Sequence, residues 1–194
     1  MNIGEMNRRI AVLRYEGNKW VEAKTVWGRM EEEQRRCVYS QNGVASLTTW
    51  KVVVYRGSGI SRENLLKVDG KLLFISAIAE TDNKNHQELS CGVVEVKRFS
   101  YELAETGRDE LNRPIVTGKM TVMFDGVLTE KYIGTNENAV YTGETQVLIL
   151  IVPKSMQLKT GTALQADGRD YVVTLRHETG EYYNEYELTV RSDV

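Results

Sequence analysis

Hydrophobic and polar residues alternate over short stretches of this chain, and polar turn residues separate one stretch from the next. Successive side chains of a β-strand point to opposite faces of its sheet, so alternation with a period of two predicts half-buried strands. We therefore expect an all-β, antiparallel protein. The predicted strands are 9–15, 24–34, 48–56, 64–68, 72–79 and 87–96 in the first half, and 101–105, 120–129, 146–152, 171–175 and 185–190 in the second half.

The two halves of the chain share one order of features. The triplet Val52–Val54 is answered by Leu148–Leu150, 96 positions later, and the turn Asp69-Gly70 returns as Asp167-Gly168, 98 positions later. Features that recur in one order predict two copies of one domain; chance similarity among valine-rich strands is the alternative. We expect two tandem small antiparallel β-barrels. The predicted domains are residues 1–97 and 98–194, with the join at 97–100.

Two long polar segments stand between the second and third strands of the two halves. Arg35–Ser46 and Lys131–Glu144 each hold about a dozen residues, more than the two to five typical of hairpin connections. We expect long loops, or loops with one short helical turn, that become ordered when a partner binds. The candidate residues for contact with a lumen or a partner are Arg35, Arg36, Tyr39, Gln41, Asn42, Tyr132, Asn136, Glu137, Tyr141 and Glu144.

The composition supports the strand prediction and limits the partners. The chain holds 22 Val, 9 Ile and 16 Thr against 9 Ala, and β-branched residues pack well in sheets. A formal net charge of −2 and a pI near 5.8 exclude a strongly basic nucleic-acid clamp and a polybasic membrane anchor. The longest apolar run, Leu72–Ala79, is too short to cross a bilayer, and no signal-peptide pattern opens the sequence. We expect a protein of the cytosol, or one assembled there, with no membrane contact.

Few residues of the chain suit catalysis. His86 and His177 fall in equivalent predicted turns, where we expect both to be solvated. Cys37 lies beside two arginines that could lower a thiol pKa, but no partner base stands near it in the sequence. Alternate residues of the acidic run Glu31–Glu33 point to opposite faces, which disfavours a metal site. We therefore predict no enzyme activity, no catalytic residue, no cofactor and no metal.

The tyrosines raise one alternative. A small β-barrel with exposed aromatic side chains can be an oligonucleotide-binding fold, in which bases stack on the rings inside a basic groove. Tyr182, Tyr183 and Tyr186 lie among three glutamates, however, and these repel phosphates. Strand packing and protein contacts, where tyrosine is enriched, are favoured for this cluster. Oligonucleotide binding remains the weaker alternative.

Several short motifs stand in a recognisable order in the first half. The basic run Asn7–Ile10 leads into an apolar strand, Val26-Trp27 lies in the next strand, and Tyr55-Arg56 ends the third. The hairpin segment Gly70–Ile75 follows, with its aromatic residue displaced by one or two positions. In this order the motifs resemble the head-tail joining family of tailed bacteriophages, whose members are also called head closure, stopper or neck proteins.

The second half is similar to a sister pattern of the same group. Its turn Thr106–Pro114 has Asn112 where that pattern usually has glycine, and the motifs Tyr141–Glu144 and Gly168–Val173 follow in order. The similarity covers nearly the whole chain and is carried by the order of the motifs. Family members usually hold one such domain, so a tandem pair is a departure.

The resemblance implies small β-barrels that form a ring beneath the portal, retain packaged DNA and present a platform for the tail. The implied partners are other copies of the chain in a ring, the portal or adaptor protein of the head, and tail-terminator or other tail proteins, with packaged DNA close by but not specifically bound. The implied location is the neck of the virion, assembled in the bacterial host cytoplasm. A tail-terminator or collar subunit of a phage-like contractile particle and a two-barrel scaffold without a virion role are the alternatives.

Overall fold

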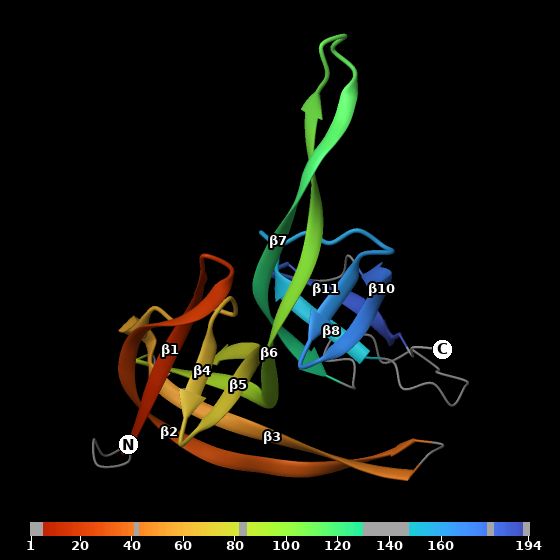
Figure 1. The fold of residues 1–194 in the computed structure, drawn as a ribbon. Coiled ribbons are helices and arrows are strands. Elements are labelled where there is room, and N and C mark those ends of the chain that lie inside the picture. The colour runs from red at the N-terminus through yellow and green to blue at the C-terminus, as the bar shows by residue number, and fades with distance from the viewer. Residues whose placement is uncertain (1–5, 41–42, 82–84, 130–147, 178–180, 192–194) are drawn as a thin grey trace. The chain divides into compact units, whose positions relative to one another are not determined.

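The chain folds into β-strands and the turns between them. A computed structural model describes residues 6–40, 43–81, 85–129, 148–177 and 181–191, and Figure 1 shows their course. The regular elements of these residues are eleven strands and one short 3-10 turn, Arg56–Ser58. The predicted all-β class is thereby confirmed. The chain divides into two compact units, Met1–Glu95 and Val96–Val194.

The described strands of the first unit form a barrel-like ring of six. In chain order they are β1 (Arg8–Glu16), β2 (Lys19–Ser40), β3 (Gly43–Tyr55), β4 (Leu65–Val68), β5 (Lys71–Glu80) and the first part of β6 (His86–Arg108). β1 pairs with β2 and β4, β2 with β3, β3 with β6, β6 with β5, and β5 with β4, all antiparallel. Because every strand has two neighbours, the ring closes on itself.

The described strands of the second unit repeat this pairing scheme. They are the second part of β6, then β7 (Pro114–Thr129), β8 (Leu148–Pro153), β9 (Ala163–Ala166), β10 (Arg169–His177) and β11 (Tyr183–Val190). The order around the ring is β6-β7-β8-β11-β10-β9, and one residue pair, Ser100 with Gln165, closes it. Strand for strand, this is the connectivity of the first unit. The repeat seen in the sequence therefore recurs as a repeated topology.

One strand, β6, serves both units without interruption. The predicted join, 97–100, lies inside this strand. Phe99 is fully buried in the core of the second unit. The backbone stays extended from His86 to Arg108, and side chains along it point alternately to the two faces of the sheet. The predicted join therefore has no turn or loop.

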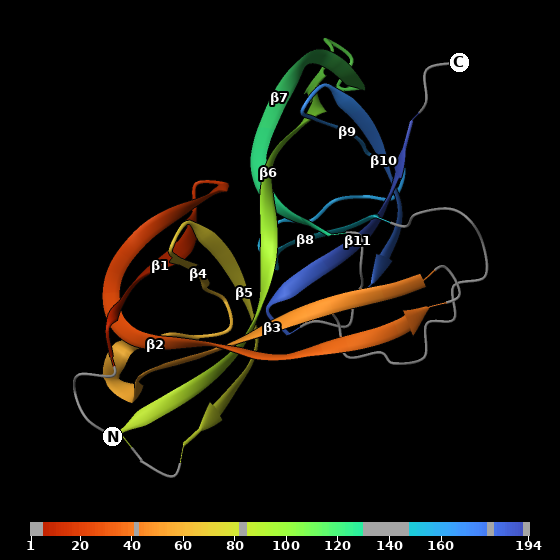
Figure 2. The same ribbon diagram turned by 90° about the horizontal axis from the view of Figure 1, so that it is seen from below.

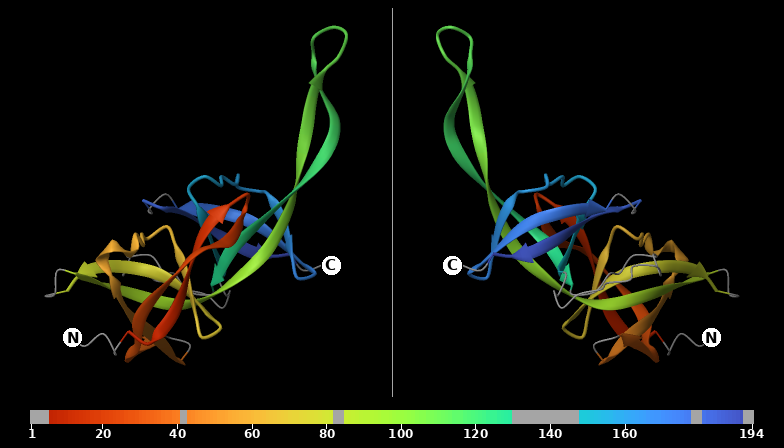
Figure 3. Two further views of the ribbon diagram at one scale, coloured as in Figure 1. Left: turned by 90° about the vertical axis from the view of Figure 1, so that its left-hand side faces the viewer. Right: turned by 90° about the vertical axis from the view of Figure 1, so that its right-hand side faces the viewer.

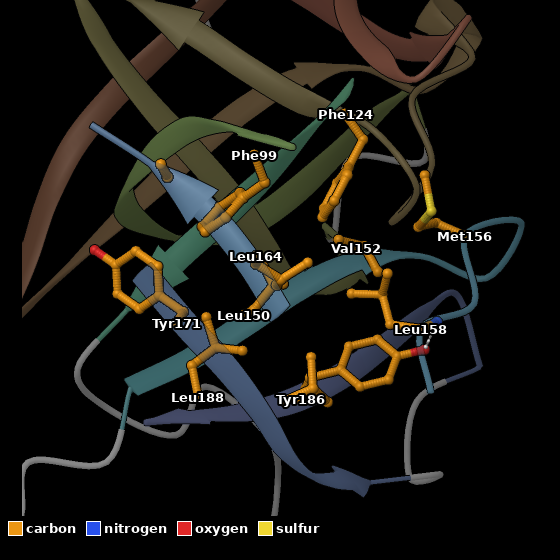
Figure 4. Packing of buried hydrophobic residues seen from close by; sticks show 12 residues of the cluster. Phe99, Phe124, Leu150, Val152, Met156, Leu158, Leu164, Tyr171, Tyr186 and Leu188 are labelled. Atoms are coloured by element: carbon orange, nitrogen blue, oxygen red, sulfur yellow. Dashed lines mark hydrogen bonds between the residues drawn. The ribbon is translucent and has the colours of Figure 1, made fainter. Parts of the chain in front are cut away.

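Each ring encloses its own core. In the first unit the inward residues of the strands are aliphatic, and in the second unit aromatic residues join them. Figure 4 shows the second core, where Phe99 stacks on Phe124 with ring centroids 5.5 Å apart and Tyr171 meets Phe99 edge-on. Burying each such side chain contributes about 1.5–3 kcal/mol. The fully or nearly fully buried residues of the first core are Ile10, Val12, Val52, Val54, Ile60, Leu66, Val68, Leu73, Ile75, Leu89 and Cys91.

The same tight turn joins the fourth and fifth strands of each ring. Asp69 and Gly70 have φ of 49° and 79°, and Asp167 and Gly168 have φ of 51° and 73°. Two successive residues with positive φ define the hairpin turn that Asp-Gly favours. Each turn aspartate also pairs with a basic residue from the first strand of its ring: Asp69 with Arg8 at 2.7 Å, and Asp167 with Lys97 at 3.1 Å.

Candidate assembly surfaces

The predicted contact residues fall on two segments of the chain. Arg35, Arg36 and Tyr39 belong to the end of β2, where the backbone pairs Arg36 with Leu47 and Tyr39 with Val44 of β3. The remaining candidates lie outside the described residues. These are Gln41, Asn42, Tyr132, Asn136, Glu137, Tyr141 and Glu144.

The polar segment Arg35–Ser46 is an extended hairpin, which differs from the long loop we predicted. β2 continues to Ser40 and β3 begins at Gly43, so only two residues connect them. Figure 2 shows the two strands side by side along this hairpin. The physical reason is local: Cys37, Val38 and Tyr39 favour strands, and the dipeptide Asn42-Gly43 favours a tight hairpin turn. The second predicted loop, Lys131–Glu144, lies outside the described residues.

A second extended hairpin comes from β6 and β7 of the second unit. We call its residues 102–121 the arm, and Figure 3 shows it as a long twisted ribbon. No residue of the arm whose burial is described is buried, and Leu111 near its turn is 72% exposed. A two-stranded hairpin alone is at best marginally stable in water. The further large apolar side chains that the arm exposes are Leu103, Ile115 and Met120.

Contacts between its own strands hold the arm together. The Lys119 Nζ atom lies 2.7 Å from Glu102 Oε2, and the Thr117 hydroxyl donates to the backbone oxygen of Glu105 at 3.3 Å. The hydrogen bond that Lys119 donates to the Glu102 carboxylate raises the pKa of Lys119 above its ordinary value. Both ends of this ion pair are well exposed, so it fixes the register of the arm more than it stabilises the fold.

The turn of the arm is ordered by one carboxylate. Asp109 Oδ1 accepts hydrogen bonds from the backbone N–H groups of Arg113 at 2.8 Å and Leu111 at 2.9 Å, and Arg113 Nε donates to Oδ2 at 2.7 Å. The backbone N–H of Arg113, followed by its side chain and the N–H of Leu111, lowers the pKa of Asp109. Asn112 has φ of 62°, a left-handed conformation that glycine or asparagine tolerates. Asn112 therefore suits this turn position without being a glycine.

A groove of about 670 Å³ runs beside the base of the arm within the second unit. Its walls come from β6, from the connection before β9, and from β9 and β10. In the described part of the chain β6 and β9 pair only at Ser100 and Gln165, so beyond this point the two strands leave a gap. The groove mixes apolar and charged residues, among them Tyr101, Leu158, Lys159, Leu164, Asp170 and Arg191.

His86 is buried and His177 is half-buried, whereas we expect both to be solvated. His86 begins β6, is 7% exposed, and stacks on Tyr55 with ring centroids 4.8 Å apart. His177 ends β10 and is half-buried, with Nε2 2.8 Å from Glu187 Oε1. The sequence predicts turns at both positions, but His86 begins β6 and His177 ends β10. Each has a packing or ion-pair partner that accounts for its position.

The buried Cys91 of the first unit has an unreactive thiol. Cys91 is 1% exposed, and burial raises the pKa of its thiol to about 12. A thiol that stays protonated at neutral pH is a poor nucleophile and a poor metal ligand. Among the residues that the structure describes, no group of three His, Cys, Asp or Glu side chains is placed to hold a metal ion.

The tyrosine cluster is mostly internal. Tyr186 is fully buried and Tyr183 nearly so, and the Tyr186 hydroxyl accepts a hydrogen bond from the backbone N–H of Leu158 at 2.9 Å. Side chains in these positions cannot stack on bases from outside. Over the described ranges of the chain, no helix has the length and apolar character needed to cross a membrane.

Comparison with known proteins adds little to this picture. No known family model matches the chain, and no curated protein matches it. One solved structure, that of K. pneumonia MrkH in complex with c-di-GMP, shows 7% identity over 97% of this chain and 82% of its own, with a TM-score of 0.15. A score this low carries no argument about fold or function.

Proposed function

We propose that this chain is a structural protein of the neck of a tailed bacteriophage, which joins the head to the tail and helps to retain packaged DNA. The observation that carries the proposal is the tandem repeat of one six-stranded ring, each copy extended by a long two-stranded hairpin. Closed rings give rigid bodies, and extended hairpins suit contacts between subunits. The motif order described above supplies the link to the head-tail joining family.

Two motifs of that resemblance occupy structurally sensible places. Asp69-Gly70 forms the tight turn between β4 and β5, and the segment Asp109–Arg113 forms the ordered turn of the arm. Both are positions where backbone geometry restricts the residue type. These placements support the resemblance without resting on any single residue.

The charge of the chain suits a neck protein that DNA passes without being held. The net charge is −2, and phosphate contacts from an excess of Lys and Arg supply most of the affinity for free DNA. In the proposed ring, copies of the chain would contact the portal or adaptor on one side and tail proteins on the other. DNA would lie near the ring without specific contacts.

A deletion in the phage that encodes the chain tests the proposal. Particles without the protein should fill with DNA, then lose it, and fail to join tails, as seen by electron microscopy and by nuclease-protected DNA per head. Heads that keep their DNA but lack tails would assign the chain to the tail end, as a terminator or collar. Full heads with stable tails would overturn the proposal.

A gel-shift series separates the neck role from oligonucleotide binding. At ~50 mM salt, where electrostatic contacts are strong, we expect no sub-micromolar binding of the purified chain to single- or double-stranded DNA. Tight binding that weakens steeply with salt would favour the oligonucleotide-binding alternative instead.

A further inference from the structure

The arm carries unpaired negative charge. Among the described residues, Glu105 and Glu110 form no ion pair, whereas the cations of the arm face acceptors of the arm itself. Lys119 pairs with Glu102, Arg113 with Asp109, and the Arg108 side chain donates to the neutral Asn112 side-chain oxygen at 2.7 Å, so Arg108 keeps its charge. With four acidic and three basic residues the arm is acidic by one charge, next to the exposed apolar side chains of Leu111 and Ile115.

The groove beside β9 carries the opposite charge. Lys159 and Arg191 line it, both are exposed, and neither forms an ion pair within the described ranges. Its acidic residues are Glu102, which Lys119 neutralises, and Asp170, which is half-buried. The free charge at the groove is thus basic. Its apolar lining includes Leu103, which is exposed, and Leu158 and Leu164, which are nearly fully buried.

The backbone of the groove is also suited to bind an extended segment such as the arm. The edge of β6 beyond Ser100 and the outer edge of β9 meet at only one residue pair, so the groove lies between two strand edges with pairing capacity left over. The arm is an extended ribbon whose strands pair with each other. An extended segment that enters such a gap adds backbone hydrogen bonds to an existing sheet.

We propose that the arm of one copy of this chain docks in the groove beside β9 of the next copy. The acidic residues Glu105 and Glu110 then meet Lys159 and Arg191, and Leu111 reaches the apolar part of the groove. Donor and acceptor surfaces differ, so the contact is head-to-tail and generates a closed ring when its rotation closes. The closed form of the assembly rests on the proposed function; the contact itself does not.

A second copy fits the arm better than nucleic acid does. The free charge of the arm repels phosphates, and its apolar side chains gain most from a protein surface that removes them from water. Such exposed apolar side chains on an extended hairpin mark an interaction site.

Charge exchange is the first test, measured by sedimentation velocity of the full chain over a concentration series. Glu105→Lys with Glu110→Lys should weaken self-association about tenfold, and so should Lys159→Glu with Arg191→Glu. Mixing the two double variants should restore association, because each then offers a complementary surface to the other. The control is Glu16→Lys with Glu63→Lys, which changes the net charge equally at exposed positions and should leave association unchanged.

A cross-linking experiment tests the position directly. In a Cys37→Ser background, a Leu111→Cys copy mixed with a Thr162→Cys copy should form a disulfide-linked dimer under mild oxidation. A Glu63→Cys copy mixed with the Thr162→Cys copy should not. Thr162 lines the groove, and Cys91 is buried and so does not compete.

Two results would overturn the proposal. The first is a chain that stays monomeric at every concentration and forms no cross-link between the two positions. The second is self-association that the charge variants do not alter. Neither result bears on the neck role, which the deletion experiment in the phage decides separately. Conversely, if the arm docks as proposed but the deletion leaves the neck intact, the contact between copies stands and the neck role is wrong.

Discussion

The Tyr186 hydroxyl accepts a hydrogen bond from the backbone N–H of Leu158 at 2.9 Å, inside the core of the second unit. Figure 4 shows this bond at the edge of the packed cluster. It ties β11 to the connection between β8 and β9, where regular strand pairing is absent from the described backbone around Leu158. The Tyr186 hydroxyl thus accepts the backbone hydrogen bond that a neighbouring strand accepts elsewhere in the ring.

Tyr186→Phe should therefore destabilise the second unit. The substitution leaves the N–H of Leu158 buried without an acceptor, which costs about 1–3 kcal/mol. Chemical denaturation followed by far-UV circular dichroism measures the loss. The matched control is Tyr171→Phe in the same core, because no described residue forms a hydrogen bond with the Tyr171 hydroxyl, and it should cost less than about 0.5 kcal/mol. Equal losses in the two variants would show that the hydrogen bond contributes nothing.

Substitution by alanine should destabilise the protein more at Gly28 of the first ring than at Gly126 of the second. A Cβ atom on Gly28 of β2 would lie 2.8 Å from the backbone oxygen of Val53 and 2.4 Å from Ile10 Cδ1. A Cβ atom on Gly126 of β7 meets only side chains, the nearest being Leu150 Cδ1 at 2.4 Å. A backbone atom cannot move aside as a methyl group can, so Gly28→Ala should cost about 1–3 kcal/mol and Gly126→Ala less.

Tryptophan fluorescence separates these two effects. All three tryptophans, Trp20, Trp27 and Trp50, lie in the first unit. Gly28→Ala should shift the fluorescence-detected unfolding midpoint, and Gly126→Ala should leave it nearly unchanged while lowering stability measured by circular dichroism. A fluorescence shift in Gly126→Ala as large as that in Gly28→Ala would contradict the expectation.

The buried thiol predicts a loss of stability at alkaline pH. Burial raises the pKa of Cys91 from 9.0 to about 12, so above pH 9 the unfolded chain ionises this thiol while the folded chain does not. The free energy of unfolding should then fall by about 1.4 kcal/mol per pH unit between these values from this group alone. Below pH 9 both states hold the proton and the contribution is constant.

Cys91→Ala isolates this contribution. The variant should be less stable at neutral pH, because it leaves a small cavity, but its stability should fall less steeply from pH 9 upward. Titration of lysines and tyrosines is common to both proteins and cancels in the comparison. Parallel pH profiles for the two proteins would show that the thiol ionises in the folded state or lies exposed.

The hairpin of β2 and β3 should be dispensable for folding. Replacing residues 34–48 with Asn-Gly joins Glu33 to Thr49, which already pair across the hairpin, and keeps every residue described as part of the first core. We expect the fluorescence-detected stability to change by less than about 0.5 kcal/mol. In phage particles the same change should impair DNA retention or neck assembly.

A charge variant shows whether DNA retention depends on the length of this hairpin or on its two arginines. Arg35→Gln with Arg36→Gln keeps the hairpin intact and removes two positive charges. If DNA retention depends on these arginines, this variant should match the shortened one; if it depends on reach, only the shortened one should fail. Normal yield of DNA-filled, tailed particles from both would remove the hairpin from the proposed mechanism.

Local chemistry made some elements predictable from the sequence. Asp69-Gly70 and Asp167-Gly168 both form the tight turns expected of Asp-Gly, because few other residue pairs adopt positive φ twice in succession. Of the strands that flank these turns, β4, β5 and β10 were predicted within one or two residues of their ends. The fourth, β9, has only four residues and was not predicted.

The hairpins were harder, for a physical reason. The arm has solvent on both faces, so its strands show no alternation of apolar and polar residues, and we predicted strands only at 101–105 and 120–129. In the structure β6 reaches Arg108 and β7 begins at Pro114. Asn42-Gly43 was a signal for the other hairpin, but the polar composition around it favoured a loop. The groove joins residues from 100 to 191 and depends on a gap in pairing, which no local pattern reveals.

The closure of the first ring by its own six strands has a consequence for synthesis. Every pairing partner of that ring lies before Glu95, so a nascent chain can complete it while the second unit is still on the ribosome. Domains generally fold as units, N-terminal first, as they emerge. The strand that finishes the first ring then continues as the strand that starts the second. Once the first ring has folded, the first part of β6 is ordered, and the second ring can begin to fold on the continuation of this strand.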